Sequence, residues 1–123
     1  MKGVELALVM TGVLLNAAAQ LLLKAGARTL TGLSFTLGNA ALIAERAILS
    51  VPILCGLLLY AISVVVWVLA LSRVQVSVAY PMLSVGYVIN AVAAWYLFGE
   101  NLGPARMAGI GIIIVGVWLV ARS

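Results

Sequence analysis

Four stretches of the sequence are apolar over the length that a helix needs to cross a lipid bilayer. They cover about residues 4–24, 51–72, 76–98 and 104–121. A spanning α-helix takes roughly 20 apolar residues, because each residue adds about 1.5 Å and the hydrocarbon core is about 30 Å thick. Only 8% of the 123 residues are charged and 66% are hydrophobic, a balance that a soluble domain of this size could not hide from water. We therefore predict an all-α membrane protein, a single four-helix transmembrane domain over residues 1–123.

The connection between the first two spans, residues 25–50, is longer than a turn requires. A helix is expected over residues 40–49, opening after Asn39. We predict an interfacial or re-entrant segment here, and the alternative is a mobile loop followed by an extended second helix. Ser50 with Pro52 then supplies the start signal of the second span.

Polar residues recur at every fourth position along the first span. They are Asn16, Gln20 and Lys24, and the next charge is Arg28. Residues four apart share one side of a helix, and polar groups at membrane depth usually face a bundle interior or a water-filled path. We predict that this face lines a polar path. The alternatives are that Asn16 and Gln20 only bridge helices and that Lys24 only anchors the helix end.

The third span carries side chains with hydroxyl groups at spacings of three and four. The residues of this face are Ser77, Tyr80, Pro81, Ser84 and Tyr87. Proline removes a backbone donor and clashes with the preceding turn, so we expect a kink near Pro81. A bent helix with hydroxyl groups suits a cavity that opens to each side in turn, whereas the plainer interpretation is ordinary hydrogen bonding between helices.

The second span has few side chains with polar atoms, and they share one face. Tyr60, Ser63 and Trp67 lie at spacings of three and four. Both aromatic residues are nearer the middle of the span than its ends, so they are expected to pack inward. Core packing is the favoured interpretation here, ahead of contact with a ligand.

The fourth span has a stripe in which small residues recur seven apart. The stripe consists of Gly109, Ile112, Ile113, Gly116 and Val117. Small residues let helix backbones approach closely in lipid, so we predict that this helix forms a dimer interface. The expected partner is a second copy or a related subunit, because four short helices barely enclose a path.

The sequence offers none of the usual constellations for catalysis. It has no histidine and a single cysteine, Cys55, and it contains no nucleophile–base pair and no glycine loop that would cradle a phosphate. The basic residues form no run, which argues against binding of nucleic acid. We expect no enzyme activity, no metal and no cofactor.

Four parts of the chain together resemble the drug/metabolite transporter superfamily. They are residues 16–24, 76–84 and 95–100 and the glycine-spaced last helix. Two groups of this size are similar: the small multidrug resistance exporters and the ArnE/ArnF-type subunits that flip aminoarabinose linked to undecaprenyl phosphate. The stripe of the last helix resembles the dimerisation motif of the exporters, and residues 79–84 resemble the flippase subunits.

Two substitutions decide between these groups. The exporters carry a glutamate eight residues before the lysine that ends the first helix, and here that position is Asn16. An amide cannot release a proton near neutral pH or balance a cationic drug. The exporters also carry a tryptophan three residues after the tyrosine that matches Tyr80, and here that position is Leu83. Both differences favour the flippase resemblance.

The resemblance implies a flippase, or a flippase subunit, that moves a polyprenyl-phosphate-linked sugar across the bacterial inner membrane among its lipids. The expected substrate-binding residues are Asn16, Gln20, Lys24, Arg28, Tyr80 and Ser84. In this hypothesis Lys24 and Arg28 bind the phosphate, and the neutral residues bind the sugar. Glu100 is expected to make a structural or gating contact in the loop. The alternatives are an exporter of small cations and an assembly partner that transports nothing.

Overall fold

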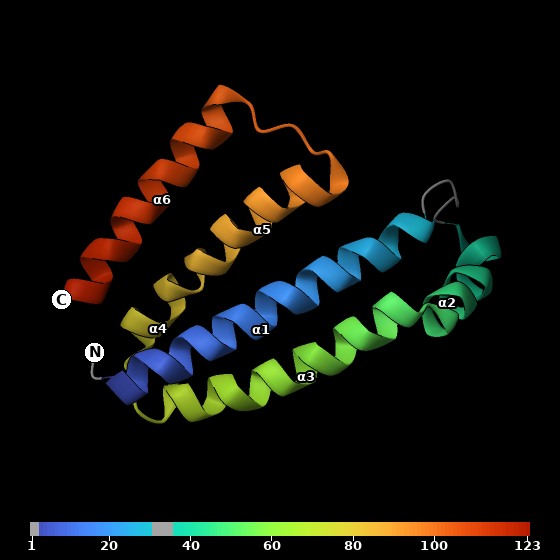
Figure 1. The fold of residues 1–123 in the computed structure, drawn as a ribbon. Helices are drawn as coiled ribbons and strands as arrows, with labels where there is room; N and C mark the ends of the chain where they lie inside the picture. Colours follow the sequence, from blue (N-terminus) through green and yellow to red (C-terminus); the bar gives the residue numbers. More distant parts are fainter. Residues whose placement is uncertain (1–2, 31–35) are drawn as a thin grey trace.

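The computed structural model describes residues 3–30 and 36–123, and every regular element among them is a helix. The elements are α1 (Gly3–Ala27), η1 (Arg28–Leu30), η2 (Leu37–Asn39), α2 (Ala40–Leu49), α3 (Val51–Leu71), α4 (Val76–Met82), α5 (Ser84–Phe98) and α6 (Pro104–Arg122), where η marks a short 3₁₀ helix. α1 and α3 run antiparallel, α4 and α5 continue one another, and α6 returns beside them (Figure 1).

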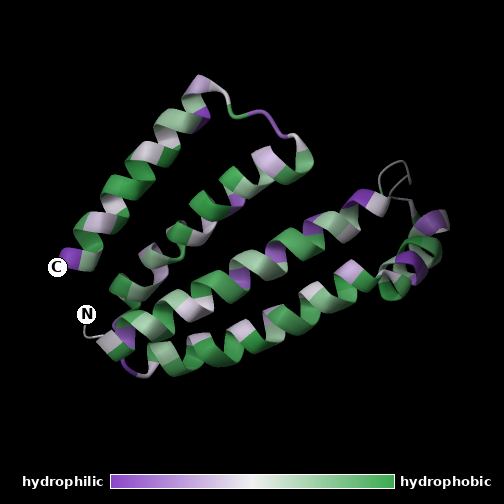
Figure 2. Cartoon of the chain, in the orientation of Figure 1, coloured by the Kyte–Doolittle hydropathy of each residue, from purple (hydrophilic) through white to green (hydrophobic). Residues whose placement is uncertain are grey.

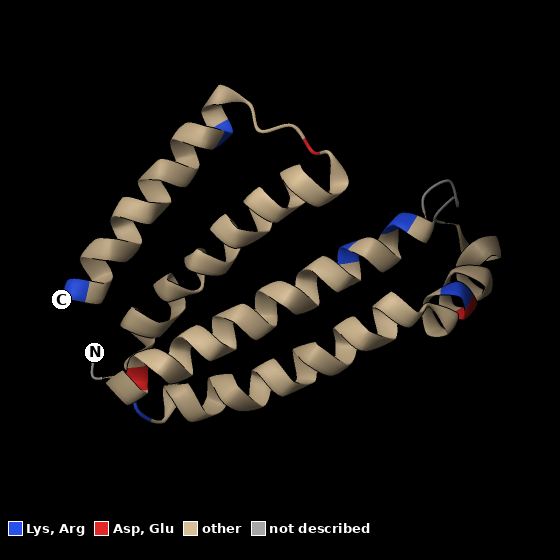
Figure 3. Cartoon of the chain, viewed as in Figure 1, with Lys and Arg blue, Asp and Glu red and all other residues tan. Residues whose placement is uncertain are grey.

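Four helical spans are long and apolar enough to cross a membrane, as the sequence predicts. They are Gly3–Leu30, Val51–Leu71, Val76–Phe98 and Pro104–Arg122. Hydrophobic residues cover the helices along their length (Figure 2), and the charged residues gather near the helix ends and in the connections (Figure 3). The chain is therefore a multi-pass membrane protein with an all-helical fold.

The connection between the first two spans holds the predicted helix. α2 covers Ala40–Leu49 and none of its residues is buried. The side-chain oxygen of Ser50 accepts a hydrogen bond from the backbone nitrogen of Ile53 at 3.5 Å, and Pro52 lies in the first turn of α3, so the predicted start signal is in place. The interfacial or re-entrant character of this segment stays a prediction, and residues 31–35 lie outside the described chain.

Glycines bring α1 and α3 into close contact. A Cβ atom on Gly56 of α3 would lie 3.1 Å from the backbone oxygen of Ala19, and a Cβ on Gly26 of α1 would lie 3.0 Å from the backbone nitrogen of Ile53. At both positions an added Cβ atom would force neighbouring atoms to shift. In lipid, helices associate through this kind of close packing rather than through a hydrophobic drive.

The third span is interrupted near Pro81. α4 ends at Met82 and α5 begins at Ser84, so that Leu83 lies between two helical segments. Pro81 has no N–H to offer the carbonyl of Ser77, and its ring crowds that carbonyl. The chain passes the break through tight turns in which Leu83 N donates to Tyr80 O and Gly86 N donates to Leu83 O.

The apolar core lies where the first half of α1 meets the α3–α4 connection and α4. Its buried residues are Val9, Val13, Ala70, Val74, Ala79 and Met82. α6 packs against α4 and α5 and contains no buried residue. One helix of the four thus leaves most of its surface for lipid or for another protein.

Candidate functional site

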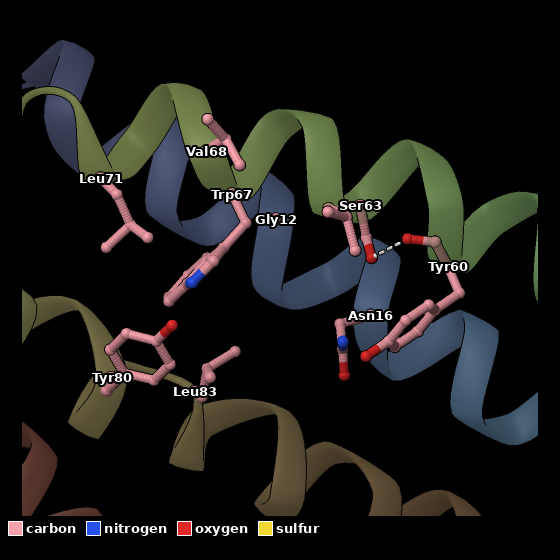
Figure 4. A pocket seen from close by; sticks show the side chains of 10 residues that line it. Gly12, Asn16, Tyr60, Ser63, Trp67, Val68, Leu71, Tyr80 and Leu83 are labelled. Atoms are coloured by element: carbon pink, nitrogen blue, oxygen red, sulfur yellow. Dashed lines mark hydrogen bonds between the residues drawn. The ribbon is translucent and has the colours of Figure 1, made fainter.

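A pocket lies between α1, α3 and the break that separates α4 from α5. Its volume is about 350 Å³, which falls within the range of small-ligand sites. Its lining residues are Gly12, Asn16, Tyr60, Ser63, Val64, Trp67, Val68, Leu71, Tyr80 and Leu83 (Figure 4). None of these ten residues is charged, so the pocket is a neutral space of mixed apolar and polar character.

The side chains of Asn16 and Tyr60 point toward one another across the pocket (Figure 4). Within the described chain the Asn16 amide makes no hydrogen bond, and so its donors and its acceptor remain available to a ligand or to water. The Ser63 hydroxyl donates to the backbone carbonyl of Tyr60 at 2.6 Å. Its oxygen can still accept a hydrogen bond from the pocket.

Aromatic rings form one side of the pocket. The rings of Trp67 on α3 and Tyr80 on α4 have centroids 5.6 Å apart and an interplanar angle of 80°. This edge-to-face geometry is the favoured one for aromatic pairs. The pair connects the second and third spans at the level of the pocket.

The charged groups gather at the other end of α1. Lys24 Nζ lies 3.8 Å from Glu100 Oε2, in a pair whose side chains are 52% and 42% exposed. The Arg28 guanidinium carbon lies 5.2 Å from the centre of the Phe98 ring, within the range of a cation–π contact. These four residues, here called the charged end, connect the end of α1 and η1 to the end of α5 and the loop that follows it.

The predicted substrate-binding residues fall into separate places. Asn16 and Tyr80 line the pocket, and Lys24 and Arg28 belong to the charged end. The pocket lining does not include Gln20, which is exposed, or Ser84, which is half-buried. Asn16 and Lys24 are eight residues apart on α1, so the pocket and the charged end are separated by about 12 Å along the helix.

Three pocket residues on α3 are ones for which the sequence favours core packing. Tyr60, Ser63 and Trp67 line the pocket, although Ser63 is also buried and Trp67 packs against the apolar core. The only sequence signal for a pocket here is that the three residues share one face of the helix. The same spacing suits packing and ligand contact equally.

One more polar group lies outside the set of predicted site residues. The side-chain oxygen of Asn90 on α5 is buried and has no hydrogen-bond partner within the described chain. Asn90 lies one turn after Gly86, where a Cβ atom would meet Val13 and Ala17 of α1. The amide therefore lies on the side of α5 that faces α1.

The stripe on α6 divides between two environments. Ile112 is 73% exposed, and a Cβ atom on Gly109 or Gly116 would meet nothing within 4 Å. Val117, in contrast, packs against the apolar core of its own chain. The stripe as a dimer interface stays a prediction, with Ile112 and the glycines as its free part.

Comparison with known proteins decides the family. The model of the EamA-like transporter family matches residues 4–122. The chain is a member of the EamA-like transporter family.

Curated relatives of this EamA-like chain carry flippase names. A protein of Erwinia tasmaniensis, named a probable 4-amino-4-deoxy-L-arabinose-phosphoundecaprenol flippase subunit ArnF, is 36% identical over 110 residues, which cover 88% of this chain and 87% of the relative. A Pseudomonas aeruginosa protein named as the corresponding probable subunit ArnE is 39% identical over 68 residues, or 55% of this chain and 59% of the relative. No solved structure matches the chain. The resemblance to this superfamily is thus confirmed.

We predict that Asn16→Leu stabilises the protein, because the Asn16 amide makes no hydrogen bond within the described chain while an unpaired polar group at membrane depth is costly. The free energy of unfolding should rise by about 1 kcal/mol. Thermal unfolding in lipid nanodiscs measures this change.

The control is Ser63→Ala, which removes a hydroxyl from the same pocket and should change stability little, because that hydroxyl only bonds its own helix. A clear loss of stability in Asn16→Leu would show instead that Asn16 bridges helices.

Proposed function

We propose that this chain is a subunit of a flippase that moves a polyprenyl-phosphate-linked amino sugar across the bacterial inner membrane. The observation that carries the proposal is the uncharged pocket beside Asn16, with two cations farther along the same helix. The named flippase relatives, one of which matches most of the chain, support it. In a headgroup that contains a sugar and a phosphate, the sugar suits the neutral pocket and the phosphate suits the two cations.

The chemistry of the pocket suits an amino sugar. The Asn16 amide and the Tyr60 hydroxyl offer donors and acceptors to sugar hydroxyls, and both lie toward the cavity. The rings of Tyr60, Trp67 and Tyr80 offer apolar faces, and an ammonium group is attracted to such rings. The substrate in the relatives' names carries an amino group on its sugar. In our proposal the aromatic rings receive this amine without a carboxylate.

The charged end suits the phosphate. Lys24 on α1 and Arg28 at the start of η1 are four residues apart in one continuous helical span, so both can reach one anionic group. Hydrogen bonds between a cationic donor and a phosphate are among the stronger ones in proteins. In our proposal the phosphate is bound first at this end, and Gln20 lies between it and the pocket. The polyprenyl tail stays in the lipid, so the path needs only a polar groove with an open side.

The working unit in this proposal is a dimer, either of two copies or with a related subunit. Two observations support an interface on α6: it has no buried residue, and its two stripe glycines face open space. Two different names, ArnE and ArnF, occur among the relatives as flippase subunits. A pair of different subunits is accordingly the partner we favour.

A second candidate function is export of small organic cations. The observation in its favour is the same group of three aromatic rings, because aromatic faces bind quaternary ammonium groups. Such an exporter would need its proton-coupling carboxylate from a partner chain, since no acidic residue lines the pocket.

Lys24→Ala tests the phosphate role. We expect headgroup translocation in proteoliposomes to fall by about tenfold or more, because the variant loses a charge-assisted contact, and Lys24→Arg to keep most of the activity. Arg73→Ala serves as the control, since it removes one positive charge from the α3–α4 connection. Undiminished translocation by Lys24→Ala would refute the role of Lys24.

Leucine at Gly109 and Gly116 tests the α6 interface. The double substitution should weaken association about tenfold or more, because the added side chains keep the helices apart, while the fold is kept because both positions face open space. Energy transfer between labelled copies in liposomes, alone and with a related ArnE-type subunit, measures association.

Gly111→Leu is the matched control, because Gly111 faces open space too but lies off the stripe. Equal loss of association in the control and in the double variant would contradict an interface at the stripe.

A further inference from the structure

We propose that Glu100 is the resting counter-ion of Lys24, and that a lipid phosphate opens the path by taking its place. The inference rests on the proposed function, since it takes Lys24 as the phosphate site. It adds a role for Glu100: the carboxylate holds the charged end closed until an anion of greater charge or better geometry arrives. The ligand class is a phosphate group on a polyprenyl chain.

Two contacts hold the charged end together. Lys24 on α1 contacts Glu100, and four residues later Arg28, the first residue of η1, contacts Phe98, the last residue of α5. The ion pair joins α1 to the α5–α6 loop, and the aromatic contact joins η1 to the last residue of α5. The end of α1 is thereby tied to the end of the third span.

The position of Glu100 follows from how α5 ends. Gly99 has φ of +67°, a left-handed conformation that glycine adopts without strain. The backbone nitrogen of Glu100 then donates to the carbonyl of Ala94 at 3.2 Å. This helix end places Glu100 in the loop beside α1, where its carboxylate lies 3.8 Å from Lys24 Nζ.

The ion pair is weak enough to exchange. Its two side chains are 52% and 42% exposed, and its atoms are 3.8 Å apart, longer than a good charge-assisted hydrogen bond. Exposed pairs of this kind change an equilibrium by only about two- to fivefold. A phosphate offers several anionic oxygens to Lys24 and Arg28 together, whereas the Glu100 carboxylate forms an ion pair with Lys24 alone among the described residues.

Exchange of the anion leads to opening. A phosphate at Lys24 carries the same sign of charge as Glu100, so the two anions repel one another at this distance. Release of Glu100 frees the α5–α6 loop from α1, while the Arg28–Phe98 contact still joins η1 to the end of α5. The gap that results lies on the route from Lys24 past Gln20 to Asn16, which share one face of α1.

The experiment measures the distance between the two elements directly. Spin labels are attached to Ala27→Cys at the end of α1 and Asn101→Cys in the loop, both exposed positions, with Cys55→Ala as background. The full chain is placed in phosphatidylcholine nanodiscs without and with undecaprenyl phosphate, and pulsed electron resonance gives the distance distribution. Native mass spectrometry of the unlabelled protein gives the affinity for undecaprenyl phosphate.

We expect undecaprenyl phosphate to shift the parent protein toward longer distances. Glu100→Gln should show these longer distances without the lipid and should bind the lipid about two- to fivefold more tightly, because the competing anion is gone. Glu45→Gln, which removes an exposed acid on α2, should behave like the parent. Lys24→Gln should show the longer distances between the spin labels without the lipid and should bind undecaprenyl phosphate more weakly than the parent.

Two results would overturn the inference in different ways. If Glu100→Gln keeps the distances and the affinity of the parent, Glu100 does not hold the charged end closed. If Glu100→Gln opens the pair but Lys24→Gln binds undecaprenyl phosphate as tightly as the parent, the ion pair closes the structure and the proposed phosphate role of Lys24 fails.

Discussion

Close packing of α1 on α3 determines where the polar groups of this protein lie. Lipid tails are as apolar as leucine, so helices in a membrane gain little from burying apolar surface and associate through backbone approach instead. Here the approach depends on Gly26 and Gly56, where an added Cβ atom would crowd atoms of the facing helix. The contact brings the Asn16 face of α1 opposite the Tyr60 and Trp67 face of α3, with the pocket between them.

The distribution of charge along the first span bears on which substrate the pocket suits. Charged residues are costly at membrane depth, and this chain keeps them out of the pocket lining and near the helix ends. What remains in the pocket is an amide, hydroxyls and aromatic rings. In our proposal, a neutral pocket with Lys24 and Arg28 beyond it suits a sugar phosphate. A cationic substrate would gain nothing from these two positive charges.

The spans could be predicted because hydropathy and helix length act locally. The helix over 40–49 and the start of α3 at Ser50 and Pro52 also follow from local signals. The pocket could be predicted only on the side of α1 and Tyr80, because the spacing of Tyr60, Ser63 and Trp67 fits core packing as well as it fits a site. The Lys24–Glu100 contact joins residues far apart in sequence, and only the arrangement of the helices brings them together.

The most direct test of the account is a comparison of two cargoes in the same proteoliposomes. One is a polyprenyl-phosphate-linked amino sugar, whose headgroup translocation is followed by its accessibility from outside. The other is a quaternary ammonium cation, whose uptake is followed under a proton gradient. We expect translocation of the lipid headgroup, with a related subunit present where one is needed, and no proton-driven uptake of the cation. Uptake of the cation without translocation of the headgroup would contradict it.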